Sequence, residues 1–256
     1  MPRSTHGGRH ELGQNFLVHP STIRTIVELV AATRGSILEL GAGDGALTRP
    51  LARLGRPLTA VDLDEHRVAS LRASLPAVTV EHVDALTVPL VHPVIVGNIP
   101  FHLTSPILRR LLAADTWNDA VLLTQWEVAR KRCGVGGSTL LTAQTAPWFT
   151  FALHGRVPST GFRPRPSVDG GVIGIRRRSA PLVPNGHRSR YERFVRAIFT
   201  GRGGTFDRIV EQATRAPHAL IHVALREAGV RAGTLPRDLS AEQWSRLWLR
   251  LQRQGG

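Results

Sequence analysis

The sequence is short of cysteine, of lysine and of long apolar runs. Its only cysteine, Cys133, leaves no disulfide framework and no cysteine metal cluster. No apolar run reaches the roughly 18 residues that a membrane-spanning helix needs, and no apolar stretch follows the positive start of the chain, so we expect no secretory signal. We also expect no metal site, because the eleven histidines show no evident ligand spacing. These absences predict a cytoplasmic protein.

Positive charge is present in large excess. Lysine and arginine total 33 against 19 acidic residues, a net charge of +14, and Lys131 is the one lysine. Arginine binds phosphate through two parallel hydrogen bonds and stacks on bases. The balance therefore favours a nucleic-acid partner, with coding bias and solubility as the alternative explanation of the charge.

Predicted strands and helices alternate over the first half of the chain. The first helix is predicted over 20–32, where Ile26 and Val30 recur at helical spacing. Strands are predicted over 36–40, 57–64, 77–86, 91–98 and 119–125, and helices over 46–55, 65–75 and 105–114. This alternation predicts an α/β fold with a mostly parallel sheet. Two later segments, 150–162 and 168–178, lack an intervening helix and predict an antiparallel hairpin at one edge of the sheet.

A second, smaller domain is predicted at the C-terminus. Residues 178–190 are rich in proline, glycine and polar side chains, and only helical patterns follow them. We therefore predict an α/β domain over residues 1–182 and a helical domain over 183–256.

Glycines and acids follow successive predicted strands. Gly41, Gly43 and Gly45 separate a strand from a helix, and the spacing GxGxG differs from the dinucleotide fingerprint GxGxxG. Asp62 ends the next strand, 21 residues after Gly41, where an acid can accept hydrogen bonds from ribose hydroxyls. Asp84 ends the third strand, near the expected position of an adenine edge. The alternative for each acid is a turn or helix cap, which is the role that we predict for Asp64.

The strand over 94–98 ends in Asn98-Ile99-Pro100-Phe101. This stretch resembles the N-(I/L/P)-P-(F/Y/W) motif of amino-group methyltransferases that use S-adenosylmethionine. Five further stretches resemble, in order, motifs of the rRNA adenine N6-methyltransferases: LGQNFL (12–17), ELGAGDG (39–45), VDLD (61–64), HVDAL (82–86) and FRPRPSVDGGV (162–172). The resemblance implies a Rossmann-like methyltransferase domain followed by a small all-helical domain.

The resemblance also implies roles for individual residues. The Asn98 amide oxygen and the Ile99 carbonyl would each accept one N–H of the target adenine amine. Pro100 would stiffen the turn, and Phe101 would stack on the flipped base. The implied contacts to S-adenosylmethionine come from Asn15, Leu17, Gly41, Gly43, Asp62, Asp84 and Asn98.

Two rRNA methyltransferase families share these motifs. The stretch TQWEVARKRCGVGGSTLLTAQ (124–144) and the stretch TGRGGTFDRIV (200–210) resemble the Erm family, which methylates a 23S rRNA adenine and confers macrolide, lincosamide and streptogramin B resistance. Ser105-Pro106 is closer to the pattern of the enzymes that dimethylate 16S rRNA adenines, which keeps that alternative open. A non-catalytic RNA-binding relative is a further alternative.

Basic residues near the expected pocket are the candidate RNA contacts. They are Arg9, Arg130, Lys131, Arg132, Arg163 and Arg165. For any one of them, a solvated surface position is an equally good explanation. We expect the protein to act as a monomer on rRNA, without a membrane or a metal ion, and with the helical domain contributing less to RNA binding.

Overall fold

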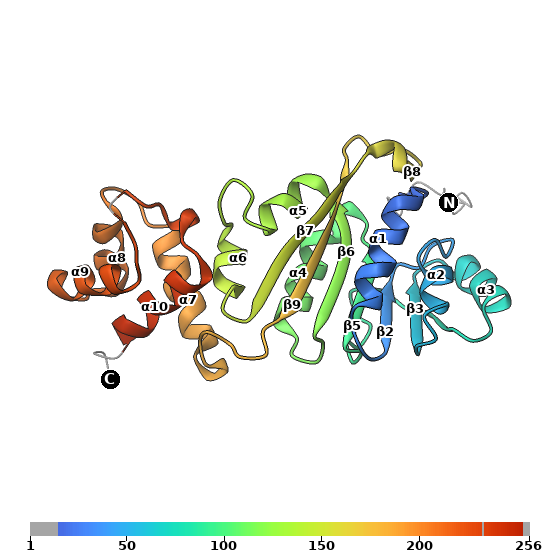
Figure 1. Cartoon of the computed structure of the whole chain (residues 1–256), viewed down its shortest axis with the longest axis horizontal. Helices are drawn as coiled ribbons and strands as arrows, with labels where there is room; N and C mark the ends of the chain where they lie inside the picture. The colour runs from blue at the N-terminus through green and yellow to red at the C-terminus, as the bar shows by residue number, and fades with distance from the viewer. Residues whose placement is uncertain (1–14, 232, 253–256) are drawn as a thin grey trace, which may run out of the picture. The chain divides into compact units, whose positions relative to one another are not determined.

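The computed structural model describes residues 15–231 and 233–252, and the chain divides into two compact units (Figure 1). The first unit contains the chain up to residue 129 together with 152–175, and the second contains 130–151 together with the chain from 176 onward. No described helix is both long and apolar enough to cross a membrane.

A seven-stranded sheet has the order β4-β3-β2-β5-β6-β9-β7. Its first five strands are mutually parallel, as predicted. The strands are β2 (Ile37–Leu40), β3 (Leu58–Asp62), β4 (Thr79–His82), β5 (Val94–Asn98), β6 (Asp119–Gln125), β7 (Phe149–Val157) and β9 (Gly170–Arg177). The accompanying helices are α1 (Pro20–Ala31), α2 (Thr48–Ala52), α3 (Glu65–Ser74), α4 (Thr104–Ala113) and α5 (Trp126–Arg132).

Local sequence accounts for most of these elements. Val94, Ile95 and Val96 are fully buried in β5, as expected for a strand that is covered on both faces. The predicted first helix places Ile26 and Val30 in the core. Asp64 caps α3, since its side chain accepts hydrogen bonds from the amides at positions 66 and 67. That prediction is confirmed.

The strand order reverses at β2. Strand β3 and then β4 lie on one side of β2, whereas β5 and the following strands lie on the other. The turns after β2 and β5 therefore diverge at the carboxyl ends of these strands and leave a crevice there. In open α/β sheets such a switch point is where ligands bind.

The predicted hairpin lies at one edge of the sheet, where β9 separates β6 from β7. The Arg178 amide donates to the Trp148 carbonyl, and the Thr150 hydroxyl donates to the Arg176 carbonyl. Position numbers therefore rise along one strand as they fall along the other, which makes β7 and β9 antiparallel.

A two-stranded antiparallel clip was not predicted. Strand β1 (Phe16–Leu17) pairs with β8 (Phe162–Arg163), and Phe16 stands opposite Arg163. The 3-10 helix η2 (Ser159–Gly161) precedes β8 and also holds the N-terminal segment, because the Val18 amide donates to the Gly161 carbonyl. The clip fixes the chain just before α1 on the side of the sheet where the strands end.

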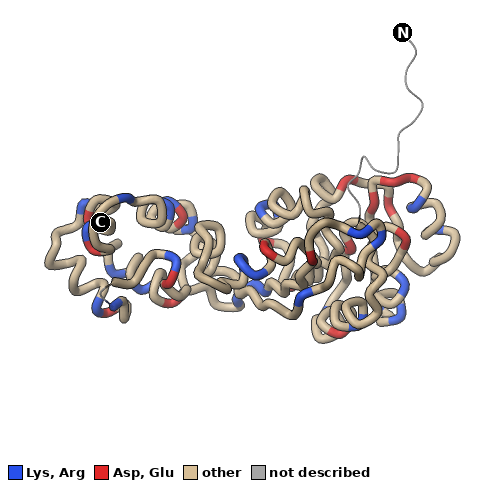
Figure 2. The backbone as a smooth tube through the Cα atoms, turned by 90° about the horizontal axis from the view of Figure 1, so that it is seen from above, with Lys and Arg blue, Asp and Glu red and all other residues tan. Residues whose placement is uncertain are grey.

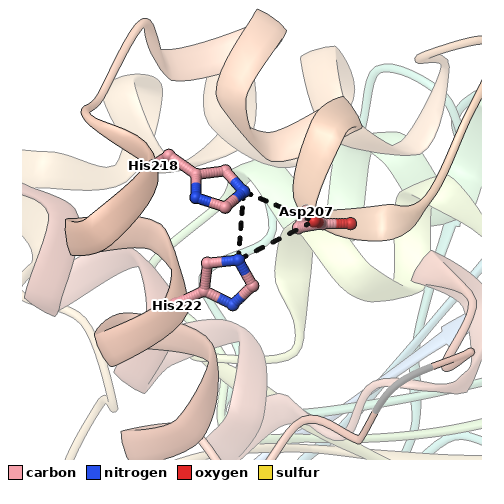
Figure 3. A group of neighbouring side chains, drawn as sticks. All are labelled: Asp207, His218 and His222. Carbon is pink, nitrogen blue, oxygen red and sulfur yellow. Dashed lines mark hydrogen bonds and ion pairs between the residues drawn. The ribbon is translucent and has the colours of Figure 1, made fainter.

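The second unit is helical. It contains α6 (Leu140–Thr145), α7 (Arg188–Phe199), α8 (Phe206–Thr214), α9 (His218–Glu227) and α10 (Ala241–Gln252), and the last four match the predicted helical patterns. Trp148, Tyr191, Trp244 and Trp248 are almost fully buried in its core. Helices α8 and α9 pack together and bring Asp207 close to His218 and His222 (Figure 3).

Residues 130–151 pack with the C-terminal helices, although the sequence analysis assigned them to the α/β domain. The physical reason is a set of contacts between α6 and α7. The Tyr191 hydroxyl donates to the Ala143 carbonyl, and the Gln144 side chain donates to the Glu192 carbonyl. A boundary between residues 182 and 183 stays a prediction.

Candidate functional site

A pocket of about 490 Å³ lies at the carboxyl ends of β2, β3 and β5, where the strand order reverses. This volume falls within the range of small-ligand sites. The lining includes nine of the predicted site residues: Asn15, Leu17, Gly41, Gly43, Asp62, Asn98, Ile99, Pro100 and Phe101. The structure thus brings together residues from the N-terminal segment, the glycine turn and the ends of two strands.

The glycine turn approaches the end of β3 through its backbone. The amides of Gly41 and Ala42 both donate to the Val61 carbonyl, at 2.9 and 3.0 Å. Gly41 and Gly43 have φ angles of +75° and +55°, which a residue with a side chain rarely adopts. Glycine is therefore required here by the turn itself.

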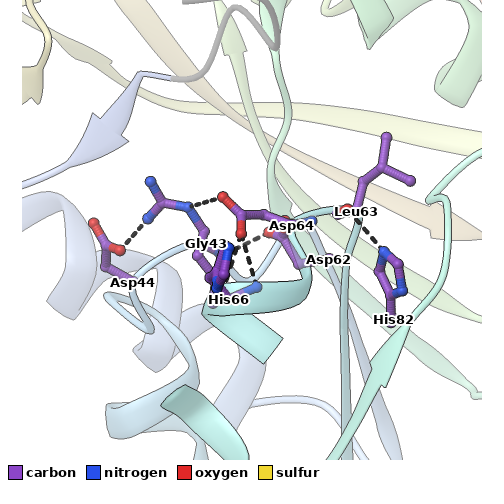
Figure 4. A network of polar contacts seen from close by, with 8 residues as sticks. Gly43, Asp44, Asp62, Leu63, Asp64, His66 and His82 are labelled. Carbon is purple, nitrogen blue, oxygen red and sulfur yellow. Dashed lines mark hydrogen bonds and ion pairs between the residues drawn. The ribbon is translucent and has the colours of Figure 1, made fainter. Parts of the chain in front are cut away.

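Asp62 connects the glycine turn to the start of α3 (Figure 4). Its Oδ2 accepts the Gly43 amide at 2.7 Å and its Oδ1 accepts the Asp64 amide at 2.9 Å, and the residue is 4% exposed. Each carboxylate oxygen can accept a second hydrogen bond. Asp62 thus has the turn role that was predicted as the alternative, and the ribose contact stays a prediction.

Phe16 covers the glycine turn. A Cβ atom added at Gly43 would lie 3.1 Å from the Phe16 ring, so the two residues touch closely. The Arg67 guanidinium lies 4.1 Å from the centre of the ring, a cation–π contact. Arg67 also forms ion pairs with Asp44 and Asp64, which hold its side chain in place. Neither Arg67 nor Phe16 was predicted as a site residue. Arg67 lies outside the motifs, and Phe16 lies in the stretch 12–17, from which only Asn15 and Leu17 were assigned cofactor contacts.

The turn after β5 presents two acceptors and one ring. The Asn98 Nδ2 donates to the Asn15 carbonyl at 2.7 Å, which fixes the orientation of the amide. The Ile99 amide donates to the Leu123 carbonyl at 2.9 Å, and the Ile99 side chain is buried. Among the described residues, no donor reaches Asn98 Oδ1 or the Ile99 carbonyl. The half-buried Phe101 begins the 3-10 helix η1 (Phe101–Leu103).

The Phe101 ring is held by a second aromatic side chain. It contacts the buried Phe162 edge to face, with 6.2 Å between the ring centres. Phe162 belongs to the β1–β8 clip, where it stands opposite Leu17. The clip therefore positions one wall of the pocket as well as the N-terminal segment.

Asp84 does not line this pocket. Its Oδ1 accepts the Leu86 amide at 2.8 Å, which is a turn-forming contact. Arg110 lies close by and donates to the Ala85 and Val88 carbonyls. Asp84 therefore has the turn role that was predicted as its alternative. Its contact with an adenine stays a prediction.

Glu39 is a buried acid of the pocket that sequence reasoning missed. It belongs to β2, is 1% exposed, and its Oε2 has no hydrogen-bond partner among the described residues. Burial raises the pKa of Glu39 to about 8, with Thr48 opposing the rise and the charge of Asp62 adding to it. The carboxyl is therefore largely protonated at neutral pH, although an approaching cation would favour its ionised form.

The candidate RNA contacts fall in both units, and arginine-rich segments occur in each (Figure 2). In the first unit Arg163 and Arg165 are exposed, and Arg165 donates to the Ser159 hydroxyl at 3.0 Å. In the second unit Arg130, Lys131 and Arg132 end α5, and Arg132 donates to the Thr139 hydroxyl at 2.6 Å. Arg132 thus helps to hold the start of α6. Arg9 lies outside the described residues.

Comparisons with known proteins agree on one family. The profile of the family described as Ribosomal RNA adenine dimethylase matches residues 5–253. The chain is 50% identical over 219 residues to an rRNA adenine N-6-methyltransferase of Corynebacterium diphtheriae, covering 84% of this chain and 87% of that protein. It is 49% identical over 255 residues to the mycinamicin-resistance protein MyrB of Micromonospora griseorubida, covering 98% of this chain and 81% of that protein.

A solved structure gives the same result for the fold. The crystal structure of the 23S rRNA methyltransferase ErmE superposes with a TM-score of 0.84 at 37% sequence identity, covering 93% of this chain and all of that one. The similarity therefore extends over both units, and the predicted Rossmann-like methyltransferase fold is confirmed.

Glu39→Gln should change how stability depends on pH. The folded protein retains a proton on Glu39 up to about pH 8, whereas the unfolded chain loses it near 4.5, so this residue makes the free energy of unfolding fall as the pH rises between these values. One pKa unit corresponds to about 1.4 kcal/mol. Relative to the wild type, Glu39→Gln should gain up to a few kcal/mol of stability across this range.

Urea-induced unfolding at a series of pH values measures this difference, with Glu28→Gln as the control because Glu28 is exposed on α1. Parallel pH profiles for wild type and Glu39→Gln would show that Glu39 titrates normally in the folded protein.

Proposed function

The chain belongs to the Ribosomal RNA adenine dimethylase family, and from this membership we propose that it methylates N6 of an adenine in 23S rRNA with S-adenosylmethionine. The activity would confer resistance to macrolide, lincosamide and streptogramin B antibiotics. The observation that carries the proposal is the turn Asn98–Phe101, which places two acceptors and an aromatic ring at one pocket. Relatives named rRNA adenine N-6-methyltransferase and mycinamicin-resistance protein support it.

The pocket suits S-adenosylmethionine in three respects. The unpartnered Glu39 Oε2 is a buried acceptor that suits the ammonium group of the methionine part. Asp62 has acceptor capacity left for ribose hydroxyls, and the backbone at Gly41 allows close approach. When bound, S-adenosylmethionine supplies a sulfonium methyl group as the electrophile.

The turn after β5 would make the target amine nucleophilic. The amine lone pair is delocalised into the adenine ring, so the nitrogen needs help to become tetrahedral. Asn98 Oδ1 and the Ile99 carbonyl can accept its two N–H groups and direct the lone pair outward. The Asn98–Asn15 hydrogen bond keeps the amide oxygen available as the acceptor. The ring of Pro100, whose φ is −50°, stiffens the turn that presents the Ile99 carbonyl.

Holding the reacting atoms in line supplies much of the rate in such a reaction. Methyl transfer needs no strong base, because the product amine can lose its proton to water after transfer. Phe101 would offer a face to the flipped base, and the edge contact with Phe162 fixes that face. Base–aromatic stacking of this kind contributes about 1–3 kcal/mol.

The second candidate is dimethylation of 16S rRNA, which Ser105-Pro106 at the start of α4 favours. The stretch 124–144 and the named relatives favour 23S rRNA. Primer extension on both rRNAs, taken from cells that express the protein, distinguishes the two. A new stop in 23S rRNA with erythromycin resistance supports the proposal. A stop confined to 16S rRNA would replace it. No stop in either rRNA, together with no N6-methyladenine in either by mass spectrometry, would contradict methyl transfer to rRNA.

Phe101→Ala should reduce methyl transfer to a 23S rRNA fragment about ten- to hundred-fold, because it removes the proposed stacking surface. Cofactor affinity, measured by calorimetry, should change little. Phe101→Tyr keeps a flat ring and should keep most of the activity. Equal activity of the alanine variant and the wild type would mean that the ring does not stack on the base.

Neutralising Arg163 and Arg165 together to glutamine should weaken rRNA binding. The slope of log affinity against log salt should flatten by roughly 0.7–0.9 for each phosphate contact that is lost. The same test applied to Arg130 and Lys131 assesses the second unit separately. Arg24→Gln/Arg34→Gln is the matched control, because both residues are exposed in the first unit. Slopes equal to the control would place the RNA on another surface.

A further inference from the structure

Two histidines and an aspartate converge in the helical unit, outside the pocket described above. Asp207 lies in the first turn of α8, His218 begins α9, and His222 follows one turn later (Figure 3). The Nε2 atoms of the two histidines are 3.0 Å apart. They lie 3.9 and 4.0 Å from Asp207 Oδ2.

The sequence accounts for this convergence. Residues four apart share one face of a helix, so the spacing of His218 and His222 places both rings on the same side of α9. The short connection between the helices contains Arg215, which has a φ of +56° and ends α8. The turn lets α9 pack back on α8, and the first turn of α8 then faces the two rings.

We propose that Asp207, His218 and His222 form a binding site for a divalent transition-metal ion of the zinc class. Imidazole nitrogens favour Zn²⁺, Cu²⁺ and Ni²⁺ over Mg²⁺ and Ca²⁺, which prefer oxygen ligands. Two histidines and one carboxylate are a common donor set for zinc, with water in the fourth position. The early expectation of no ligand spacing among the histidines overlooked this pair.

The distances are close to those of such a site. A tetrahedral ion with bonds of about 2.0–2.1 Å has donor atoms roughly 3.3 Å apart. The two nitrogens, at 3.0 Å, are already near this separation. The carboxylate needs to move inward by about half an ångström, which a small side-chain rotation provides.

Asp207 is positioned to act as the anionic ligand. It lies in the first turn of α8, and its side chain is 26% exposed, whereas those of His218 and His222 are 60% and 56% exposed, so an ion can reach all three donors from solvent. In the metal-free protein one imidazole must donate to the other across the 3.0 Å contact. A bound ion would take the lone pairs of both rings.

The test uses the untagged full-length protein after treatment with a chelator. Zn²⁺ is titrated in competition with a chromogenic chelator, and Co²⁺ is used as a spectroscopic probe because its visible absorption reports four-coordinate geometry. We expect one ion per chain. Asp207→Asn should weaken Zn²⁺ binding about ten-fold or more, and His218→Gln/His222→Gln should abolish it. Glu211→Gln, one turn after Asp207 on the same helix, should bind as the wild type does.

Circular dichroism of each variant shows that it is folded, and the melting temperature supplies a second readout. Zn²⁺ should raise the melting temperature of the wild type and of Glu211→Gln, but not that of the histidine variant, because a ligand that binds only the folded state stabilises it. No Zn²⁺ binding by the wild type would overturn the proposal. Binding that survives the histidine substitutions would place the ion elsewhere. A Zn²⁺ affinity of Asp207→Asn equal to that of the wild type would show that the carboxylate is not a ligand and would overturn the three-ligand site.

Discussion

The candidate site depends on the carboxylate of Asp62. One oxygen holds the Gly43 amide and the other holds the Asp64 amide, in a position that is almost fully buried. A carboxylate is the one side chain that can accept both hydrogen bonds without adding a donor. The end of β3, the glycine turn and the start of α3 are therefore fixed relative to one another, and so is the floor of the pocket.

Contacts extend from this junction to the opposite wall of the pocket. Asp64 caps α3 and pairs with Arg67, whose guanidinium lies over Phe16. Phe16 belongs to the clip with β8, and the Phe162 ring of that clip contacts Phe101. The proposed cofactor side and the proposed base side are thus joined through packed side chains of a single compact unit. The two-residue strand β1, which pairs with β8 outside the seven-stranded sheet, therefore supports the site.

Sequence patterns were sufficient where the signal is local. The buried run 94–96, the glycine turn and the Asp64 cap each follow from a few adjacent residues. Contacts between distant segments gave no such signal: a strand as short as β1 has no periodicity, and the packing of 130–151 on α7 depends on side chains about 50 positions apart. Glu39 was missed for a different reason: the strand predicted over 36–40 includes it, but the sequence alone does not show that its carboxyl lies at the pocket. The His218–His222 spacing was visible, but only the fold adds Asp207 to it.

Glu39 and Asp62 place two carboxyl groups in one pocket, and their different environments matter for ligand binding. Asp62 has two backbone donors, whereas Glu39 Oε2 has no partner and Glu39 carries a pKa of about 8. Protonation of Glu39 keeps a second charge out of the buried pocket, where it would be costly without a counter-ion. A ligand with an ammonium group would reverse this balance, because it supplies the counter-ion and favours the ionised carboxyl. Binding of such a ligand is then coupled to release of a proton, so the strand that anchors the glycine turn also selects for positive charge.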